Sequence, residues 1–279
     1  MTAARGRHRA WLVAGIALFG ALALAAGIVI GTHVPRRAPD DSLAADFARL
    51  QSSLHATAGI AITAVGSGQK PLVLGDFRTG PAWSTVKVPL VMAALRAENP
   101  PTVTAEMTAA ITESDNAAAE SLWASLGDPV SAAQKVDAVL RRSGDPTSVQ
   151  SVRIRPEFSA IGQTDWALTE QVRFVSSAWC DGANAPVFAL MANVDAAQRW
   201  GIGVIDGARF KGGWGPSPAG SYLVRQLGVL VTPAGDSAVA LAVQPDSGRF
   251  EDGTAELSKI AEWLVAHRAA LPTGRCGSP

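Results

Sequence analysis

The sequence predicts an α/β protein of the α+β kind: a mostly antiparallel sheet of about five strands, flanked by the amino- and carboxy-terminal helices, beside a helical lobe. Two stretches of the chain indicate this fold. Residues 41–97 read as helix, hairpin and helix, and residues 222–267 read as strand, strand and helix. About 220 residues remain once the amino-terminal segment is set aside, which is enough for one large domain or two closely packed ones.

The amino-terminal segment is predicted to be a membrane anchor. Residues 11–31 contain no charged side chain, and arginines flank them on both sides. A run of this length can span a bilayer. We expect a cytoplasmic basic tail at residues 1–10, a transmembrane signal-anchor at 11–34 and a linker at 35–45, with the domain outside because basic residues prefer the cytoplasmic side. A cleavable secretory signal is the alternative, and its removal would leave the domain secreted.

Outside that segment the chain is mildly acidic. Without the five arginines of the first 37 residues, 19 basic residues remain against 24 acidic ones, a net charge of −5. A domain with this net charge shows no excess of basic residues of the kind that binds nucleic acid. Cys180 and Cys276 both fall in the part expected outside the cytoplasm, where disulfides form. We expect these two cysteines to pair, and two free thiols are the alternative.

The hairpin expected near the start of the domain contains a serine and a lysine three residues apart. Ser67 lies in a Gly-Ser-Gly turn between the apolar runs 60–65 and 71–74, and Lys70 follows it. A turn between two strands offers no helical face on which the two side chains could meet. We therefore interpret this pair as part of the turn.

Ser84 and Lys87 have the same spacing in a different context. An apolar, helix-compatible run at 88–95 follows them, and Ser or Thr favours the start of such a helix. Three residues apart on a helix, the two side chains lie on one face. A neutral lysine there could take the hydroxyl proton, because a free serine needs an adjacent base to become a nucleophile. A serine that only caps the helix is the alternative.

Two further motifs would complete an acyl-transfer site. Ser-Asp-Asn occupies residues 114–116, and Lys-Gly-Gly occupies residues 211–213 at the start of a strand-like stretch. Two apolar runs, 222–231 and 237–243, follow and read as adjacent strands. A closing helix is expected at 254–267, with apolar side chains at a helical period at Leu257, Ile260, Ala261, Leu264 and Val265.

Together the motifs at residues 84–87, 114–116 and 211–213 resemble the S-x-x-K, Ser-Asp-Asn and Lys-Thr-Gly set of the class A β-lactamases, which are penicillin-recognising serine hydrolases. The resemblance covers most of residues 46–270 and leaves 271–279 as a tail. It implies that Ser84 is the nucleophile and that Lys87 is its base or tunes one. It also implies that Ser114 relays a proton to the leaving nitrogen, while Lys211 holds this relay and attracts an anionic substrate.

The same resemblance implies the substrate contacts. Asn116 would hydrogen-bond the amide side chain of the substrate, and Arg225, on the next strand, would bind its carboxylate. The backbone N–H groups of Ser84 and Trp214 would form the oxyanion hole, and Gly213 would let a carbonyl approach the strand edge. A glycine-rich bend at a strand end is the alternative for the third motif.

Three departures separate the chain from that family. Gly212 replaces a hydroxyl residue that contacts the substrate carboxylate, and Ser84 and Ser114 are only 30 residues apart. The Glu-x-x-Asn signature, whose glutamate activates the deacylating water, is missing between about residues 143 and 165. Glu157 is the only glutamate there, and we expect it on a solvated loop. The shortened helical lobe should leave the cleft more open.

These observations favour a membrane-anchored, extracytoplasmic serine hydrolase that forms an acyl-enzyme with β-lactams or peptidoglycan stem peptides and deacylates slowly. A non-catalytic or weakly catalytic binding module for peptidoglycan or β-lactams is one alternative, and a scaffold beside wall-synthesis enzymes is another. No cofactor or metal is expected, since no zinc-binding spacing of His, Glu or Cys occurs. No G-x-S-x-G elbow for a nucleophilic serine occurs either. No histidine suits a Ser-His-Asp triad; the four are His8, His33, His55 and His267.

Overall fold

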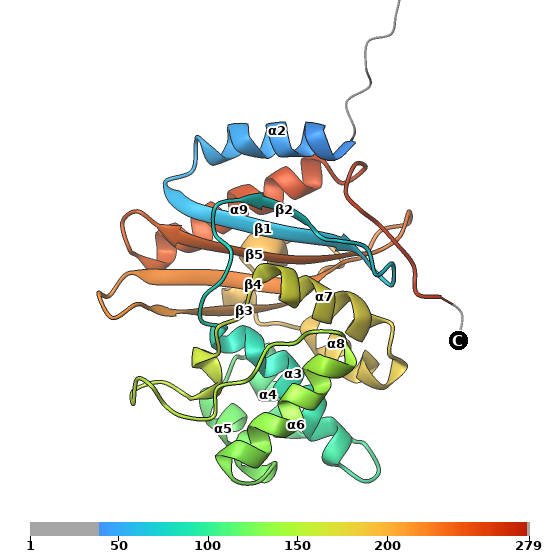
Figure 1. The fold of residues 1–279 in the computed structure, drawn as a ribbon, viewed down its shortest axis with the longest axis vertical. Helices are drawn as coiled ribbons and strands as arrows, with labels where there is room; N and C mark the ends of the chain where they lie inside the picture. Colours follow the sequence, from blue (N-terminus) through green and yellow to red (C-terminus); the bar gives the residue numbers. More distant parts are fainter. Residues whose placement is uncertain (1–38, 278–279) are drawn as a thin grey trace, which may run out of the picture. The chain divides into compact units, whose positions relative to one another are not determined.

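A five-stranded antiparallel sheet forms the centre of the structure, whose computed structural model describes residues 39–277. The strands follow the order β2-β1-β5-β4-β3 (Figure 1). Every pairing in this sheet is antiparallel, which confirms the predicted fold class and the adjacency of the two apolar runs that become β4 and β5. The strands are β1 Ala56–Ala64, β2 Leu72–Gly75, β3 Arg209–Pro216, β4 Tyr222–Leu230 and β5 Ser237–Pro245.

The amino-terminal boundary of the domain differs from the prediction. The basic tail at 1–10, the anchor at 11–34 and the first part of the linker lie outside the described residues. The second part of the linker is helical instead, because α2, Pro39–Gln51, begins within it and buries Leu43 and Phe47. Within residues 39–277, no helix is long and apolar enough to cross a membrane.

Helices cover both faces of the sheet. α2 and α9, Phe250–Ala266, pack on one face, and α7, Leu168–Trp179, packs on the other (Figure 1). α9 begins four residues before the helix predicted from the apolar period. Because side chains alternate across a strand, β5 contributes to two cores. It directs Val239, Leu241 and Val243 toward α2 and α9, and Ala238, Ala240 and Ala242 toward α7.

The remaining helices form the predicted lobe beside the sheet (Figure 1). α3, Lys87–Ala97, lies among them, and its residues from Lys87 to Leu95 are all buried. A helix that is apolar on nearly every side belongs in a core. The others are α4 Ala105–Thr112, α5 Asn116–Ser125, α6 Pro129–Arg142 and α8 Ala185–Met191, with short 3-10 turns η1 Trp83–Val86, η2 Ile161–Gln163, η3 Gly182–Asn184, η4 Ala196–Gln198 and η5 Gly201–Val204.

The predicted hairpin joins β1 to β2. Gly66 and Gly68 have φ angles of 68° and 63°, in the left-handed region that glycine adopts most readily. Between them, the Ser67 hydroxyl donates to the backbone carbonyl of Ala64 over 2.9 Å, and Lys70 is exposed. The first serine and lysine pair is therefore part of a turn, as predicted.

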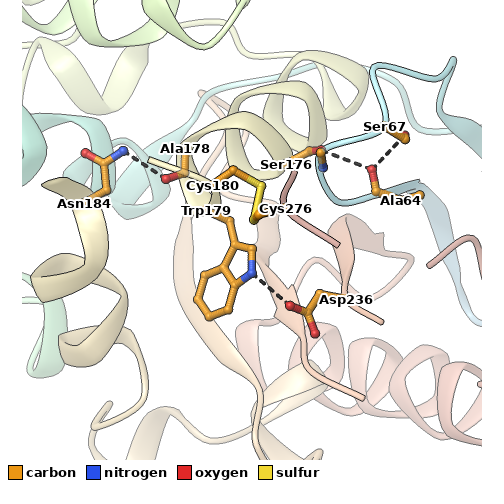
Figure 2. The surroundings of a disulfide bond; sticks show 10 residues. Ala64, Ser67, Ser176, Ala178, Trp179, Cys180, Asn184, Asp236 and Cys276 are labelled. Carbon is orange, nitrogen blue, oxygen red and sulfur yellow. Dashed lines mark hydrogen bonds between the residues drawn. A yellow bond between two sulfur atoms is a disulfide. The ribbon is translucent and has the colours of Figure 1, made fainter. Parts of the chain in front are cut away.

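A disulfide ties the carboxy-terminal segment to the domain. Cys180, which ends α7, is bonded to Cys276 across 96 residues of sequence, so the predicted pairing is confirmed (Figure 2). Beside it, the indole of Trp179 donates to the Asp236 carboxylate over 2.9 Å. Leu271 is buried, and Asp236 also forms a backbone bridge with Gly274. The segment after residue 270 is therefore fastened to the domain rather than being a free tail.

Candidate active site

Ser84 lies in the 3-10 turn η1, directly before α3. Its side chain is half-buried, and no hydrogen bond is formed by its hydroxyl to the described part of the chain. The residues that cap η1 and α3 are Ala82 and Val86, and neither cap involves a side-chain hydrogen bond. The capping alternative for Ser84 is therefore wrong. The residue before it, Trp83, has a φ of 48°, a strained conformation of the kind found at functional sites.

Strand β3 passes directly over the backbone of this turn. A Cβ atom placed on Gly213 would lie 2.8 Å from the backbone nitrogens of both Ser84 and Thr85. Only a glycine allows an approach this close. β3 is also an edge strand, which leaves alternate backbone N–H and C=O groups unpaired by the sheet. The turn and the strand edge beside Trp214 are thus adjacent, as an oxyanion hole built from Ser84 and Trp214 requires.

Lys87 is buried, and its ammonium donates to the loop that carries the second motif. Its acceptors are the Ser114 carbonyl at 2.6 Å, the Asn116 Oδ1 at 2.7 Å and the Asp115 carbonyl at 3.2 Å, with the Ser114 hydroxyl at 3.5 Å. The Ser84 hydroxyl is not among these acceptors, so the expected contact between Ser84 and Lys87 is not made. Burial lowers the Lys87 pKa to about 8, against the opposing effects of Asp115 and Glu120.

Ser114 lies between the two motif lysines. Its hydroxyl accepts from Lys211 Nζ at 2.9 Å, in addition to the longer contact from Lys87. Ser114 has a φ of 59°, and the next residue, Asp115, caps α5 by accepting from the Ala118 N–H. Lys211 is fully buried, and burial, followed by the nearby Lys87, lowers its pKa well below the usual value. The structure therefore brings Lys87, Ser114 and Lys211 into one hydrogen-bonded group.

A cleft of about 470 Å³ opens beside this group. Ser84, Lys87, Asn116 and Trp214 all line it, so four of the predicted site residues share one cavity. Ser84 and Lys87 therefore lie on one cleft, and they carry the hydroxyl and the amine that acyl transfer needs. Within residues 39–277, no group of three or more His, Cys, Asp or Glu side chains is arranged to hold a metal ion.

Arg225 does not reach this cleft, and its expected role in binding a substrate carboxylate is wrong. Its side chain is fully buried, and its guanidinium donates to the carbonyls of Gly80, Pro81 and Trp166 and to the Gln171 side chain, at 2.6 to 2.9 Å. Burial lowers the Arg225 pKa to about 9. Arg225 therefore fastens the loop before η1 to α7, and although its Nε has no partner in the described residues, the whole side chain is buried away from the cleft.

Two glutamates line the cleft, and each forms an ion pair with an arginine. Glu157 pairs with Arg155 at 2.9 Å, and its side chain is 55% exposed, so the predicted solvated loop also forms part of the cleft rim. Glu120 pairs with Arg153 at 3.1 Å. Glu120 belongs to none of the three motifs, although it follows Asn116 by four residues on α5 and therefore lies on the same helix face.

Comparison with known proteins addresses the fold. No protein-family model matches the chain, and no curated protein sequence matches it. Solved structures do match. A class A β-lactamase from Bacteroides cellulosilyticus has 15% identity and a TM-score of 0.66, covering 81% of this chain and 97% of its own. The chromosome-encoded β-lactamase of Vibrio parahaemolyticus has 13% identity and a TM-score of 0.63, covering 81% and 98%.

An ancestral class A β-lactamase reconstructed for Gram-negative bacteria gives the same result. It has 18% identity and a TM-score of 0.63, and the match covers 80% of this chain and 99% of the ancestral one. Identities this low establish a fold rather than an activity. Because the matches span nearly the whole length of these proteins, the chain has the β-lactamase-like serine hydrolase fold of the class A β-lactamases.

Proposed function

We propose that this protein is a serine hydrolase that forms an acyl-enzyme at Ser84, with β-lactams or related cell-wall amides as substrates. The observation that carries the proposal is the shared environment of the three motifs. Ser84 and Lys87 open onto one cleft, while the Ser114 hydroxyl is held between Lys87 and Lys211. This arrangement provides a nucleophile, a base and a proton relay within one site.

In the proposed acylation, the Ser84 oxygen bonds to the substrate carbonyl carbon while its proton passes to neutral Lys87. At pH 7, a group with a pKa of about 8 is neutral in roughly one molecule in ten. The carbonyl oxygen gains negative charge and is stabilised by the N–H groups of Ser84 and Trp214. The C–N bond then breaks, and Ser114 donates its proton to the leaving nitrogen while recovering one from Lys87.

Hydrolysis of the acyl-enzyme is proposed to be slow. Water must then attack the ester carbon, and this step needs a base for the water proton. The carboxylates that line the cleft in the described residues are Glu120 and Glu157, and each is already paired with an arginine. At Glu157 a backbone hydrogen bond, followed by Arg155, lowers the carboxyl pKa against the opposing effect of desolvation, and a carboxylate of lower pKa is a weaker base. Acylation should therefore outrun hydrolysis.

Burst kinetics with a chromogenic β-lactam test this proposal. We expect release of about one product per enzyme, followed by a slow steady state, the pattern of an accumulating acyl-enzyme. Ser84→Ala should abolish the burst, whereas Glu120→Gln and Glu157→Gln should change the slow phase by less than about threefold. Fast turnover without a burst, lost in either glutamine variant, would identify that glutamate as a deacylating base and refute slow hydrolysis.

A binding module without turnover is the second candidate function. The specific observation in its favour is that the Lys87 ammonium donates to residues 114–116 and not to Ser84. If Lys87 stays there, Ser84 has no base. Reversible binding of a stem peptide with no covalent adduct at any pH would favour this second function.

The proposal also includes a location outside the cytoplasm, on the single-pass anchor predicted at residues 11–34. Its support is the uncharged run with its basic flank and the Cys180–Cys276 disulfide, because disulfides persist in oxidising compartments. Protease added to intact cells should digest the domain and spare the residues before the anchor. Protection of the domain would contradict this location.

A further inference from the structure

The backbone groups of β3 that face its open edge belong to alternate residues. Just past the end of the strand, the Ser217 N–H donates to the Ser221 carbonyl across the β3–β4 turn over 2.8 Å. The backbone of Ser217 therefore faces β4. Because this direction alternates along an antiparallel strand, the backbone groups of Pro216, Trp214 and Gly212 face away from β4. An extended ligand chain laid along this edge meets the backbone of these residues.

The carbonyls at the two ends of this stretch already accept hydrogen bonds from side chains. The Gly212 carbonyl accepts from Lys211 Nζ over 3.0 Å, and the Pro216 carbonyl accepts from the guanidinium of Arg155. Pro216 also has no N–H to donate. The Trp214 carbonyl lies between the two and accepts from no side chain of residues 39–277. Trp214 is therefore the residue of this stretch that can exchange both backbone hydrogen bonds with a ligand.

Arg155 is held beside Pro216 by further contacts of its side chain. The guanidinium pairs with Glu157 at 2.9 Å and lies over the ring of Phe158, 4.4 Å from the centroid. The Phe158 ring in turn packs edge-on against Trp83, with centroids 5.0 Å apart. The Arg155 side chain is only 25% exposed. Its position at the Pro216 carbonyl is therefore fixed by several neighbours.

A second cavity, of about 630 Å³, adjoins the cleft at this point. Trp83, Gly215 and Pro216 line both cavities, whereas Arg155 lines the second cavity and not the cleft. Because Arg155 is bonded to Pro216, its side chain lies at the boundary between the two spaces. Without this side chain, the edge of β3 would run on from the cleft into the second cavity.

The acyl half of a substrate lies toward Pro216, and its leaving group lies toward Lys211. Ser114, which protonates the leaving atom in the proposed mechanism, is bonded to Lys211. The cleft extends the other way, because the residues of β3 that line it are Trp214, Gly215 and Pro216.

An acyl half bound antiparallel to β3 has a defined register. With the scissile carbonyl on the Trp214 N–H, the N–H of the first acyl residue donates to the Trp214 carbonyl. Residues are counted here away from the scissile bond. The backbone groups of the second residue point away from β3, and the N–H of the third residue faces the Pro216 carbonyl. The third residue is thus the first one to meet the Arg155 guanidinium.

We propose that Arg155 and Pro216 end the substrate-binding edge of the cleft, so that the enzyme recognises the backbone of a single residue on the acyl side of the scissile bond. This inference rests on the proposed function and narrows its substrate class to amides of N-acylated residues. A penicillin carries the required N–H on its acylamino group, and a stem peptide carries it on its penultimate residue. Residues farther away gain no backbone hydrogen bond, and Arg155 is the specificity-determining residue.

Two matched thioesters of one thiol test this limit during catalysis: acetyl-Gly-Gly-D-Ala and acetyl-sarcosyl-Gly-D-Ala. They differ by one N-methyl group, which removes the N–H that faces Pro216. The parent protein should be acylated by both at rates within about twofold. Arg155→Ala frees the Pro216 carbonyl, so the glycyl thioester should become favoured by on the order of fivefold, as expected for one hydrogen bond.

Two controls isolate the effect of the guanidinium. Glu157→Gln removes the carboxylate partner of Arg155 and keeps the guanidinium, so it should leave the two rates within about twofold. The shorter acetyl-D-Ala thioester ends before Pro216, and it should acylate the parent and Arg155→Ala at similar rates. Because each preference is a ratio measured within one variant, a general loss of activity cancels.

Equilibrium binding separates this inference from the proposed function. In the Ser84→Ala variant, calorimetry with acetyl-Gly-Gly-D-Ala-D-Ala and its sarcosyl counterpart reports the same preference without any chemistry. The two peptides should bind equally, and adding Arg155→Ala should favour the glycyl peptide by on the order of fivefold.

Three results would overturn the inference: a preference for the glycyl peptide while Arg155 is present, no preference once it is removed, or no binding of either peptide. The expected change in binding, together with no thioester acylation at Ser84, would refute the catalytic proposal while supporting the limit set by Arg155.

Discussion

Lys87 and Lys211 both donate to the hydroxyl of Ser114, and both are buried. Two ammonium groups that share one acceptor repel each other, and removal from water disfavours both charges. Each effect lowers the pKa of the pair, which is what a lysine acting as a base near neutral pH requires. Asp115 and Glu120 oppose the shift at Lys87. The charge state of Lys87 therefore depends on a small number of identifiable neighbours.

The pH dependence of acylation tests this account of Lys87. A base with a pKa of about 8 must lose its proton to act, so the acylation rate should rise with pH, about tenfold per unit below 8, and level off above it. Glu120→Gln removes a carboxylate that raises this pKa, so it should shift the midpoint to lower pH. A stopped-flow profile from pH 6 to 10 measures both. A midpoint near 10.5, or no shift in the variant, would contradict the assignment.

Arg225 shows why side-chain direction was the hardest feature to predict. All of β4 except its first residue is buried, so its sequence lacks the alternation of apolar and polar residues that marks an exposed face. A one-residue difference in register turns a side chain to the opposite face of a sheet. Arg225 faces α7, whereas Gln226, the next residue, lies toward Trp200. Glu120 was within reach of a helical-spacing argument, because it follows Asn116 by four residues.

At the level of elements, local signals predicted the hairpin, the strands β4 and β5 and the closing helix well. Each has its own turn residues or apolar period. The start of α2 was mistaken for a linker because Pro39 and two aspartates resemble a loop, although proline is well suited to the first turn of a helix. The fastening of the carboxy-terminal segment was foreseen only through the disulfide, since a backbone bridge has no signature in sequence.

Removing the disulfide should lower stability without altering the site. Replacing Cys180 and Cys276 with serine frees a 96-residue loop in the unfolded chain, and loop entropy predicts a loss of about 4 to 5 kcal/mol in the free energy of unfolding. Urea denaturation of the double variant measures this loss. The acylation rate of the folded variant should match that of the parent, because neither cysteine lines the cleft. Unchanged unfolding, or two thiols reactive in the native protein, would contradict the prediction.

For the whole molecule, the sheet, the lobe and the meeting of three distant motifs followed from the sequence and its family resemblance. The set of residues that line the cleft was not predicted from the sequence. Its three tryptophans, Trp83, Trp123 and Trp214, and the paired Arg153 come from separate parts of the chain, and only the assembled fold brings them into one cleft with Ser84. The fold is shared with class A β-lactamases at identities of 13 to 18%.

The most direct test of the central claim is the mass of the intact protein after reaction. Benzylpenicillin, and separately the 4-nitrophenyl ester of phenylacetic acid, should each add one acyl group, and peptide mapping should locate it on Ser84. Ser84→Ala should show no adduct. Ser67→Ala, which removes the serine of the hairpin turn, should acylate like the parent protein. Absence of any adduct with both reagents, or an adduct that persists in Ser84→Ala, would contradict the account.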